Sequence, residues 1–186
     1  ERARYDLDVL ASRFRGSFEQ AANRLVSLSR SGASGVPFFF LEADAAGNRL
    51  RRAGAQGFPQ NRFGGACPKL VLHAAFAQPG RILVEAVAMP DGAAFLTLAR
   101  TVDGPQAAFD ERPRRTVLLL GCDISYKDRL VYGATVPSTE INMLIPIGPA
   151  CRLCERQGCL ARAEPPVTRP LGLDDMVTGF SAFDFQ

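Results

Sequence analysis

Three of the five cysteines lie within nine residues near the end of the chain, and this block most constrains the fold. Cys151, Cys154 and Cys159 have the spacing C-x2-C-x4-C. The surrounding segment contains six prolines that interrupt any long helix or strand: Pro137, Pro146, Pro149, Pro165, Pro166 and Pro170. Because coordination free energy becomes folding free energy for a segment without its own core, we expect a metal-stapled C-terminal tail.

The residue types in this block predict a thiolate site for a soft metal. An odd number of cysteines, three of them clustered, suits metal binding in a reducing compartment better than a disulfide framework, so we expect a cytoplasmic protein. Thiolates favour an iron–sulfur cluster or zinc over calcium or magnesium, and the spacing alone leaves both open. For a fourth ligand we favour Cys67, in a glycine-rich loop before Pro68.

The remaining cysteine and the only histidine have simpler interpretations. Cys122 ends a strongly apolar run and is expected to be a buried core residue. His73 lies on the side of a predicted helix, where a single histidine is usually a hydrogen-bonded structural residue. An enzyme with Cys67 or Cys122 as nucleophile and His73 as base is a weaker alternative, because the chain has no paired carboxylate motif; we expect no enzymatic activity.

Apolar periodicity predicts an α+β fold. Helical spacing covers residues 6–14, and Ser17 with Gln20 forms a capping box that opens a second helix reaching about residue 29. These two helices resemble a helix-turn-helix, but few basic side chains favour a packing or linking unit. Shorter helices are expected at 68–77 and 125–131. Strands are expected at 36–43, 48–55, 81–89, 93–102 and 116–122, giving a mainly antiparallel sheet of about five strands. The small residues at 31–35 are the expected boundary between a helical lead-in, 1–30, and a main domain, 36–186.

Composition excludes some classes of protein. No apolar run approaches the roughly 20 residues that cross a bilayer, so we expect no membrane partner. A net charge of +3, with basic and acidic residues mixed, does not by itself indicate nucleic-acid binding.

Several segments together resemble one family, the short-chain fatty acyl-CoA regulators of propionate and acetate catabolism. The resemblance covers nearly the whole chain and is carried by residues 35–40, 62–68, 73–76, 79–82, 120–123 and 151–156. Residues 10–14 and 17–25 are similar to the end of the metallopeptidase-like segment that precedes the sensor domain in these regulators. One departure is Leu70, where the family pattern leads us to expect an aromatic residue.

The resemblance implies a function and a site. It implies a GAF/PAS-like sensor domain for short acyl-CoA thioesters, a 4Fe-4S cluster rather than zinc, and DNA binding through an N-terminal XRE-type helix-turn-helix domain absent from this chain. We also expect a homo-oligomer. Because coenzyme A carries phosphates, cationic and aromatic side chains are the candidates for its site. They are Arg62, Phe63 and Gly64 first, with Arg52, Arg81, Tyr126 and Arg129. A zinc-stapled interaction module without a small ligand is the remaining alternative.

Overall fold

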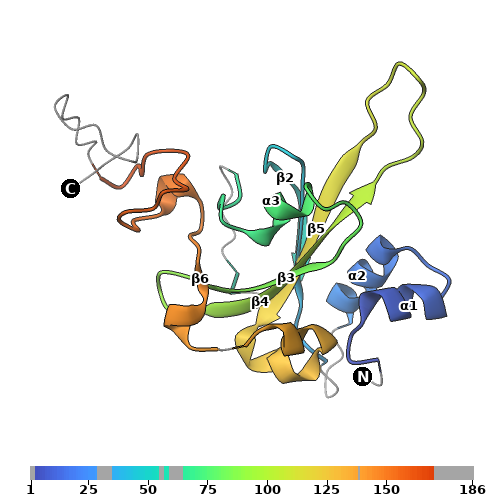
Figure 1. Cartoon of the computed structure of the whole chain (residues 1–186), viewed down its shortest axis with the longest axis horizontal. Coiled ribbons are helices and arrows are strands. Elements are labelled where there is room, and N and C mark those ends of the chain that lie inside the picture. Colours follow the sequence, from blue (N-terminus) through green and yellow to red (C-terminus); the bar gives the residue numbers. More distant parts are fainter. Residues whose placement is uncertain (1–2, 29–34, 55–56, 59–64, 138, 170–186) are drawn as a thin grey trace.

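The computed structural model describes residues 3–28, 35–54, 57–58, 65–137 and 139–169. Its centre is a six-stranded sheet with the strand order β2-β1-β5-β4-β3-β6 (Figure 1). The strands are β1 (Phe39–Ala43), β2 (Arg49–Gly54), β3 (Leu83–Ala88), β4 (Ala94–Asp103), β5 (Arg115–Asp123) and β6 (Ile145–Pro146). All neighbours are antiparallel except β3 and β6. This confirms the predicted α+β class and the mainly antiparallel sheet, whereas the likeness to GAF and PAS domains stays a prediction.

Alternation along β5 gives the sheet two buried faces. Val117 and Leu119 point to one hydrophobic cluster, and Leu118 and Leu120 to the other; all four are fully buried. A strand covered on both faces reads as a continuous apolar run, which is why this segment was predicted as a central strand. The sheet therefore carries helices or loops on each side.

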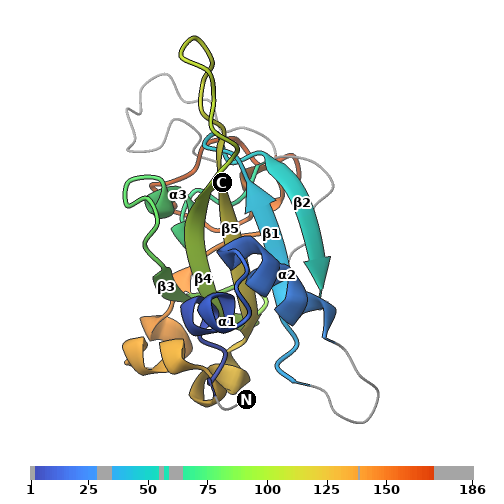
Figure 2. The same cartoon turned by 90° about the vertical axis from the view of Figure 1, so that its right-hand side faces the viewer.

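The two N-terminal helices cover one face. Asp6 caps α1 (Leu7–Arg13), and Ser17 with Gln20 forms the predicted capping box of α2 (Phe18–Ser27). Both helices contribute to the cluster that contains Leu118 and Leu120, and Figure 2 shows them lying across β1, β5 and β4. The expected lead-in thus packs directly on the sheet.

The other face is covered by α3 (Val71–Ala75) and the loop before it. Val71, Leu72 and Ala75 of α3 pack in the same cluster as Cys67 and Phe58. This helix is shorter than the predicted span of 68–77, because Leu70 is its extended N-cap.

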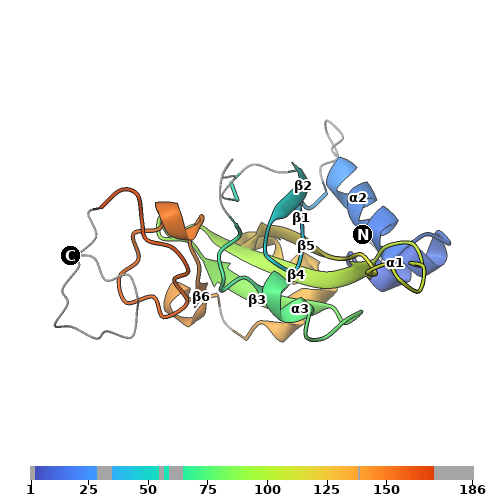
Figure 3. The ribbon, with the colours of Figure 1, turned by 90° about the horizontal axis from the view of Figure 1, so that it is seen from above.

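After β5 the chain forms short 3₁₀ turns. They are η1 (Ile124–Arg129), η2 (Val131–Thr135), η3 (Ile141–Met143) and η4 (Cys151–Leu153). The α-helix expected at 125–131 is wrong: this stretch is 3₁₀, ended by the extended Leu130 between η1 and η2. The two-residue strand β6 was not predicted, and it leads into the cysteine segment that extends from one end of the sheet (Figure 3). Among the described residues, no helix is long and apolar enough to cross a membrane.

Candidate functional site

Cys67 lies at the start of the loop that enters α3 and is almost completely buried. Its Sγ accepts a hydrogen bond from the backbone amide of Gly148, 81 residues away, at 3.5 Å. Burial raises the pKa of the Cys67 thiol; backbone amides of Gly148 and Lys69 lower it, and nearby Cys151 and Cys154 raise it. The structure therefore brings Cys67 close to two members of the cysteine block.

Gly148 also contacts the sulfur of Cys154. A Cβ atom added to Gly148 would lie 2.4 Å from Cys154 Sγ, closer than real Cβ contacts. Only glycine leaves room for this approach, and the same residue thus touches the sulfurs of Cys67 and Cys154.

The C-x2-C turn is held by its own backbone and by one arginine. The amide of Cys154 donates to the carbonyl of Cys151 at 3.2 Å, and the amide of Ala163 donates to Cys151 Sγ at 3.4 Å. The guanidinium of Arg162 donates to the carbonyls of Cys151 and Cys154 at 3.2 and 3.0 Å. Its amide donates to the carbonyl of Cys159 at 3.1 Å, so all three cysteines of the block border Arg162.

The residue types of this cysteine set suit a soft metal or an iron–sulfur cluster, although their sulfurs are not grouped around one point in this structure. Cys67, Cys151 and Cys154 lie in one neighbourhood, and their thiolates are the ligands such groups prefer. Within the described parts of the chain, no three His, Cys, Asp or Glu side chains are grouped so that they could hold a metal ion. The four-cysteine site with Cys159 therefore stays a prediction.

Cys122 and His73 have structural roles in this fold. Cys122 is fully buried in the cluster beneath α1 and α2, on the opposite sheet face, and burial raises the pKa of its thiol to about 12. It is the core residue that the sequence predicted. His73 hydrogen-bonds to the backbone of Cys67, burial lowers the pKa of its ring, and its Cε1 fills the space beside Gly47. The ring thus braces the Cys67 loop against the β1–β2 turn.

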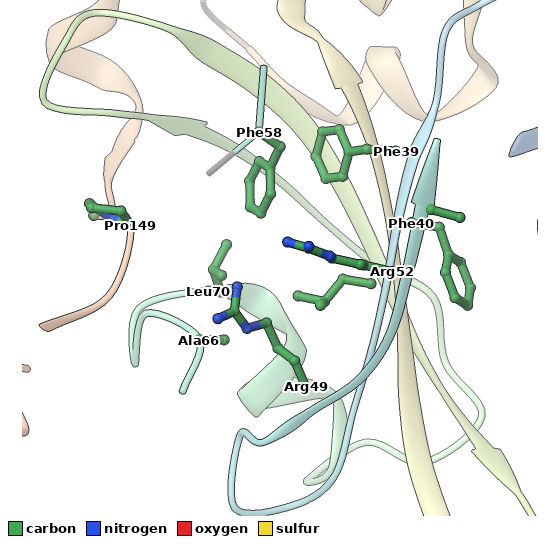
Figure 4. Close-up of a pocket in the computed structure, with 11 residues that line it drawn as sticks. Phe39, Phe40, Arg49, Arg52, Phe58, Ala66, Leu70 and Pro149 are labelled. Atoms are coloured by element: carbon green, nitrogen blue, oxygen red, sulfur yellow. The ribbon is translucent and has the colours of Figure 1, made fainter. Parts of the chain in front are cut away.

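A pocket opens next to the cysteines, on the α3 side of β1 and β2. It is lined by Phe39, Phe40, Leu41, Arg49, Arg52, Ala53, Phe58, Ala66, Leu70, Gly148 and Pro149. The rings of Phe39 and Phe58 are stacked with centroids 4.2 Å apart, and they form an apolar aromatic wall. Figure 4 shows the guanidinium groups of Arg49 and Arg52 pointing into the space between β2 and Pro149.

A β-bulge brings the two arginines to the same side of β2. Leu41 pairs with Arg52 and Glu42 with Arg51, but Ala43 pairs with Arg49, so Leu50 is the extra residue. In regular alternation, positions 49 and 52 would point to opposite faces. Burial and the charge of Arg52 lower the pKa of Arg49, as expected where two cations share one pocket. The pocket therefore offers an apolar slot beside concentrated positive charge.

Only part of the predicted ligand site is assembled here. Arg52 lines the pocket, as the prediction requires, whereas Arg81 lies elsewhere and donates to Gln78 Oε1 at 2.8 Å. Tyr126 and Arg129 lie in η1: Tyr126 packs on the cluster that contains α1 and α2, and Arg129 stacks over its ring at 5.8 Å. These three residues therefore do not line this pocket, and their part in binding coenzyme A stays a prediction. Arg62, Phe63 and Gly64 lie outside the described residues.

Other residues of the site were missed by the sequence analysis. Arg49 was missed because the bulge is invisible in the sequence, and Phe39 and Phe58 because they read as core residues. Gly148 and Pro149 join the pocket to the cysteines. Both residues line the pocket, and Gly148 also contacts the sulfurs of Cys67 and Cys154. The proline-rich composition around them gave no signal for this role.

Comparison with known proteins agrees with this architecture. Residues 27–183 match the family described as short-chain fatty acyl coenzyme A regulator, C-terminal. The chain is 44% identical over 171 residues to a propionyl-CoA carboxylase regulator of Cereibacter sphaeroides, covering 92% of this chain and 37% of that protein. It is 40% identical over 177 residues to the HTH-type transcriptional regulator RamB of Mycobacterium tuberculosis, with 94% and 37% covered. It is 38% identical over 179 residues to the regulator PrpR of that organism, with 94% and 36% covered.

A solved structure shares the fold. It is a Mycobacterium tuberculosis transcriptional regulator with a TM-score of 0.89 and 35% identity, covering 96% of this chain and 55% of the solved one. The chain spans about 37% of the length of the curated relatives that it matches. All three relatives are named as regulators, two of them as HTH-type transcriptional regulators, which agrees with the expectation that the chain is not an enzyme. The chain therefore belongs to the family of short-chain fatty acyl coenzyme A regulators, as a C-terminal domain of that family.

Proposed function

We propose that this domain senses short-chain acyl-CoA in the pocket formed by β1, β2 and the Gly148–Pro149 segment. The observation that carries the proposal is the pairing of Arg49 and Arg52 with the stacked rings of Phe39 and Phe58 in one pocket. Coenzyme A needs cationic groups for its phosphates, and a short acyl chain needs an apolar slot. The family description and the relative named as a propionyl-CoA carboxylase regulator support the same class of effector.

We further propose that Cys67, Cys151, Cys154 and Cys159 hold an iron–sulfur cluster of the 4Fe-4S type, with zinc as the alternative occupant. The support is the approach of Cys67 to Cys151 and Cys154 across 83 or more intervening residues, and the resemblance described above. When bound, the group would supply the staple that the proline-rich segment lacks. The residues would act by fixing the Cys67 loop to the segment that follows β6.

The shared wall at Gly148 and Pro149 gives the two sites a physical connection. A rearrangement of the cysteine loop moves Gly148, and Gly148 lines the pocket that contains Arg52. Acyl-CoA that binds one arrangement of this wall better than another would shift the population between them. The α1–α2 pair, packed on the sheet, would transmit the change to a DNA-binding domain outside this chain, in keeping with the relatives' names as HTH-type regulators.

Calorimetric titration tests the ligand. Metal-loaded chain is titrated with propionyl-CoA and acetyl-CoA, and we expect saturable heat with at least one of them. Absence of heat with both thioesters would overturn the acyl-CoA proposal. Free acyl groups such as propionate serve as the control, because they lack the phosphates that Arg49 and Arg52 would contact.

Metal analysis tests the cysteine site. Chain purified without oxygen is analysed for iron, sulfide and zinc, together with its visible spectrum, in wild type, Cys67→Ala and Cys122→Ala. We expect about four irons with sulfide per chain for a 4Fe-4S cluster, lost in Cys67→Ala and kept in Cys122→Ala, whose thiol lies on the opposite face. A content of one zinc per chain, without iron and sulfide, would instead indicate a structural zinc site. The cytoplasmic location and the homo-oligomeric state stay predictions.

A further inference from the structure

Two arginines beside the cysteine block hold its backbone in place. Arg162 donates to three carbonyl groups of the loop: those of Cys151 and Cys154 at 3.2 and 3.0 Å, and that of Arg156 at 2.5 Å. A guanidinium has five N–H donors in a fixed planar fork, which suits several acceptors on one turn. The turn that carries Cys151 and Cys154 is therefore wrapped around one side chain.

Arg156 holds the segment that follows β6. Its Nε donates to the carbonyl of Ile147 at 2.9 Å, and its Nη2 donates to the carbonyl of Ala88, at the end of β3, at 3.0 Å. The carbonyl of Ile147 and the amide of Gly148 are two ends of one peptide group, and that amide donates to Cys67 Sγ. A hydrogen bond to the carbonyl strengthens the amide as a donor, because hydrogen bonds in a chain polarise one another.

Each arginine is linked to a peptide group whose amide donates to a cysteine sulfur, Arg156 through a hydrogen bond from its guanidinium and Arg162 through its own backbone carbonyl. For Arg156 the peptide is Ile147–Gly148 and the sulfur is that of Cys67. For Arg162 the next residue, Ala163, donates to Cys151 Sγ at 3.4 Å. Both arginines come from the cysteine loop, which also carries Cys151, whereas Cys67 comes from a distant part of the chain.

Charge supports the same arrangement. Residues 151–169 contain four arginines and two glutamates, so the segment around the thiolates is cationic. Thiolates and the clusters they bind are anionic, and nearby cations stabilise them. An exposed arginine of the same loop, Arg152, contributes charge without hydrogen bonds to these carbonyls among the described residues.

We propose that Arg156 and Arg162 are positioning residues of the cysteine site, which orient Cys67 and Cys151 through backbone amides rather than by contact with the bound group. This inference rests on the proposed cysteine site and adds residues that the cysteine spacing does not indicate. Outer partners of this kind typically change metal affinity by roughly 10- to 100-fold when they are replaced.

The experiment compares wild type with Arg156→Gln, Arg162→Gln and Arg162→Lys, and uses Arg152→Gln as the matched control. Each chain is reconstituted without oxygen with ferrous iron and sulfide, and bound iron is followed during release to a chelator. We expect release to be roughly tenfold faster or more in the three positioning variants and unchanged in Arg152→Gln. Arg162→Lys separates geometry from charge: retention of wild-type release in this variant would overturn the geometric role of Arg162.

A second measurement does not depend on bound metal. In the metal-free chain, the alkylation rate of each cysteine by iodoacetamide is measured by mass spectrometry. We expect the alkylation rate of Cys67 in Arg156→Gln and of Cys151 in Arg162→Gln to differ several-fold from that of the wild type, with the rate of Cys122 unchanged. Wild-type rates at both positions, together with wild-type iron release, would overturn the inference. A wild-type chain that takes up neither iron nor zinc would instead contradict the proposed metal site, while the alkylation rates would still decide whether the arginines position the sulfurs.

Discussion

The backbone amide of Gly148 donates to Sγ of Cys67 at 3.5 Å, and this hydrogen bond joins the loop before α3 to the segment after β6. Gly148 also lies against Cys154 Sγ and lines the pocket that contains Arg52. One residue without a side chain therefore connects a cysteine from each part of the chain with the candidate ligand site.

Gly148→Ala should damage the cysteine site and the fold together. The new Cβ would lie 2.4 Å from Cys154 Sγ, so the loop must shift, and such overpacking typically costs about 1–3 kcal/mol. We expect a lower free energy of unfolding in urea and a lower metal content. Gly65→Ala is the control, because among the described residues its added Cβ meets only the carbonyl group of Gly47, at an ordinary 3.5 Å from the oxygen. Equal stability of the two variants would show that the close contact at Gly148 is relieved without cost.

Much of the fold could be predicted because its signals are local. The apolar run of β5, the alternation of the other long strands and the capping box of Ser17 each depend on a few neighbouring residues. The strand β6 has only two residues and pairs with β3 from 58 positions away, so no local pattern marks it. Its neighbour Ile147 continues the contact by donating to the carbonyl of Ala88 at 2.9 Å.

The candidate site was predicted only where chemistry alone identifies a residue. Cysteine spacing pointed to Cys151 and Cys154, and the glycine-rich loop pointed to Cys67, because thiols carry their own signal. Charge alone does not place an arginine: Arg52 lines the pocket, whereas Arg81 and Arg129, candidates for the same reason, contact other residues. Arg49 was missed because it reaches the pocket through the bulge at Leu50, which depends on the pairing of β1 with β2.

Arg52→Gln should weaken acyl-CoA binding without destabilising the fold. Loss of a charge-assisted hydrogen bond to phosphate typically costs about 1.5–3 kcal/mol, which corresponds to roughly a 10- to 100-fold higher dissociation constant. This loss of affinity should be smaller at high salt, because screening already weakens the attraction between Arg52 and the phosphates in the wild type. Arg81→Gln removes the same charge away from the pocket and should bind as wild type does. An equal loss of affinity in both variants would indicate a general charge effect rather than a site at the pocket.

Glu42, which is buried, and Glu85, which is half-buried, should respond to neutralisation in opposite ways. Glu42 is buried and accepts a hydrogen bond from Arg51, which also binds Glu19 of α2. Glu42→Gln should therefore cost about 1–3 kcal/mol of unfolding free energy, because a charge-assisted bond is lost. Glu85 has an oxygen, Oε2, that is buried without a hydrogen-bond partner among the described residues. Glu85→Gln should raise the unfolding free energy near neutral pH.

The pH dependence of the unfolding free energy gives the sign of the contribution from Glu85. Burial raises the pKa of this carboxyl in the folded chain above the 4.5 of an exposed glutamate. The folded chain then holds more protons than the unfolded chain, so its stability falls as pH rises from 4.5 through the folded pKa. Glu85→Gln should remove that loss of stability. The variant should therefore be more stable than the wild type near neutral pH, and this difference should vanish as the pH approaches 4.5 from above. Urea titrations across this range check the prediction; an advantage independent of pH would contradict burial of the charge as its cause.

Arg15→Gly should stabilise the chain through the backbone alone. Arg15 follows α1 with a φ of 52°, and the next amide, of Gly16, donates to the carbonyl of Ala11 at 2.9 Å. Glycine is favoured at this position after a helix, because a left-handed conformation costs other residues roughly 1–2 kcal/mol. After allowance for the greater freedom of glycine in the unfolded chain, we expect a gain of about 0.5–1 kcal/mol in urea unfolding. Arg15→Ala removes the same side chain but keeps a Cβ atom, so it should show no gain. If both variants stabilise the chain equally, the cause is loss of the arginine side chain and not relief of the left-handed backbone.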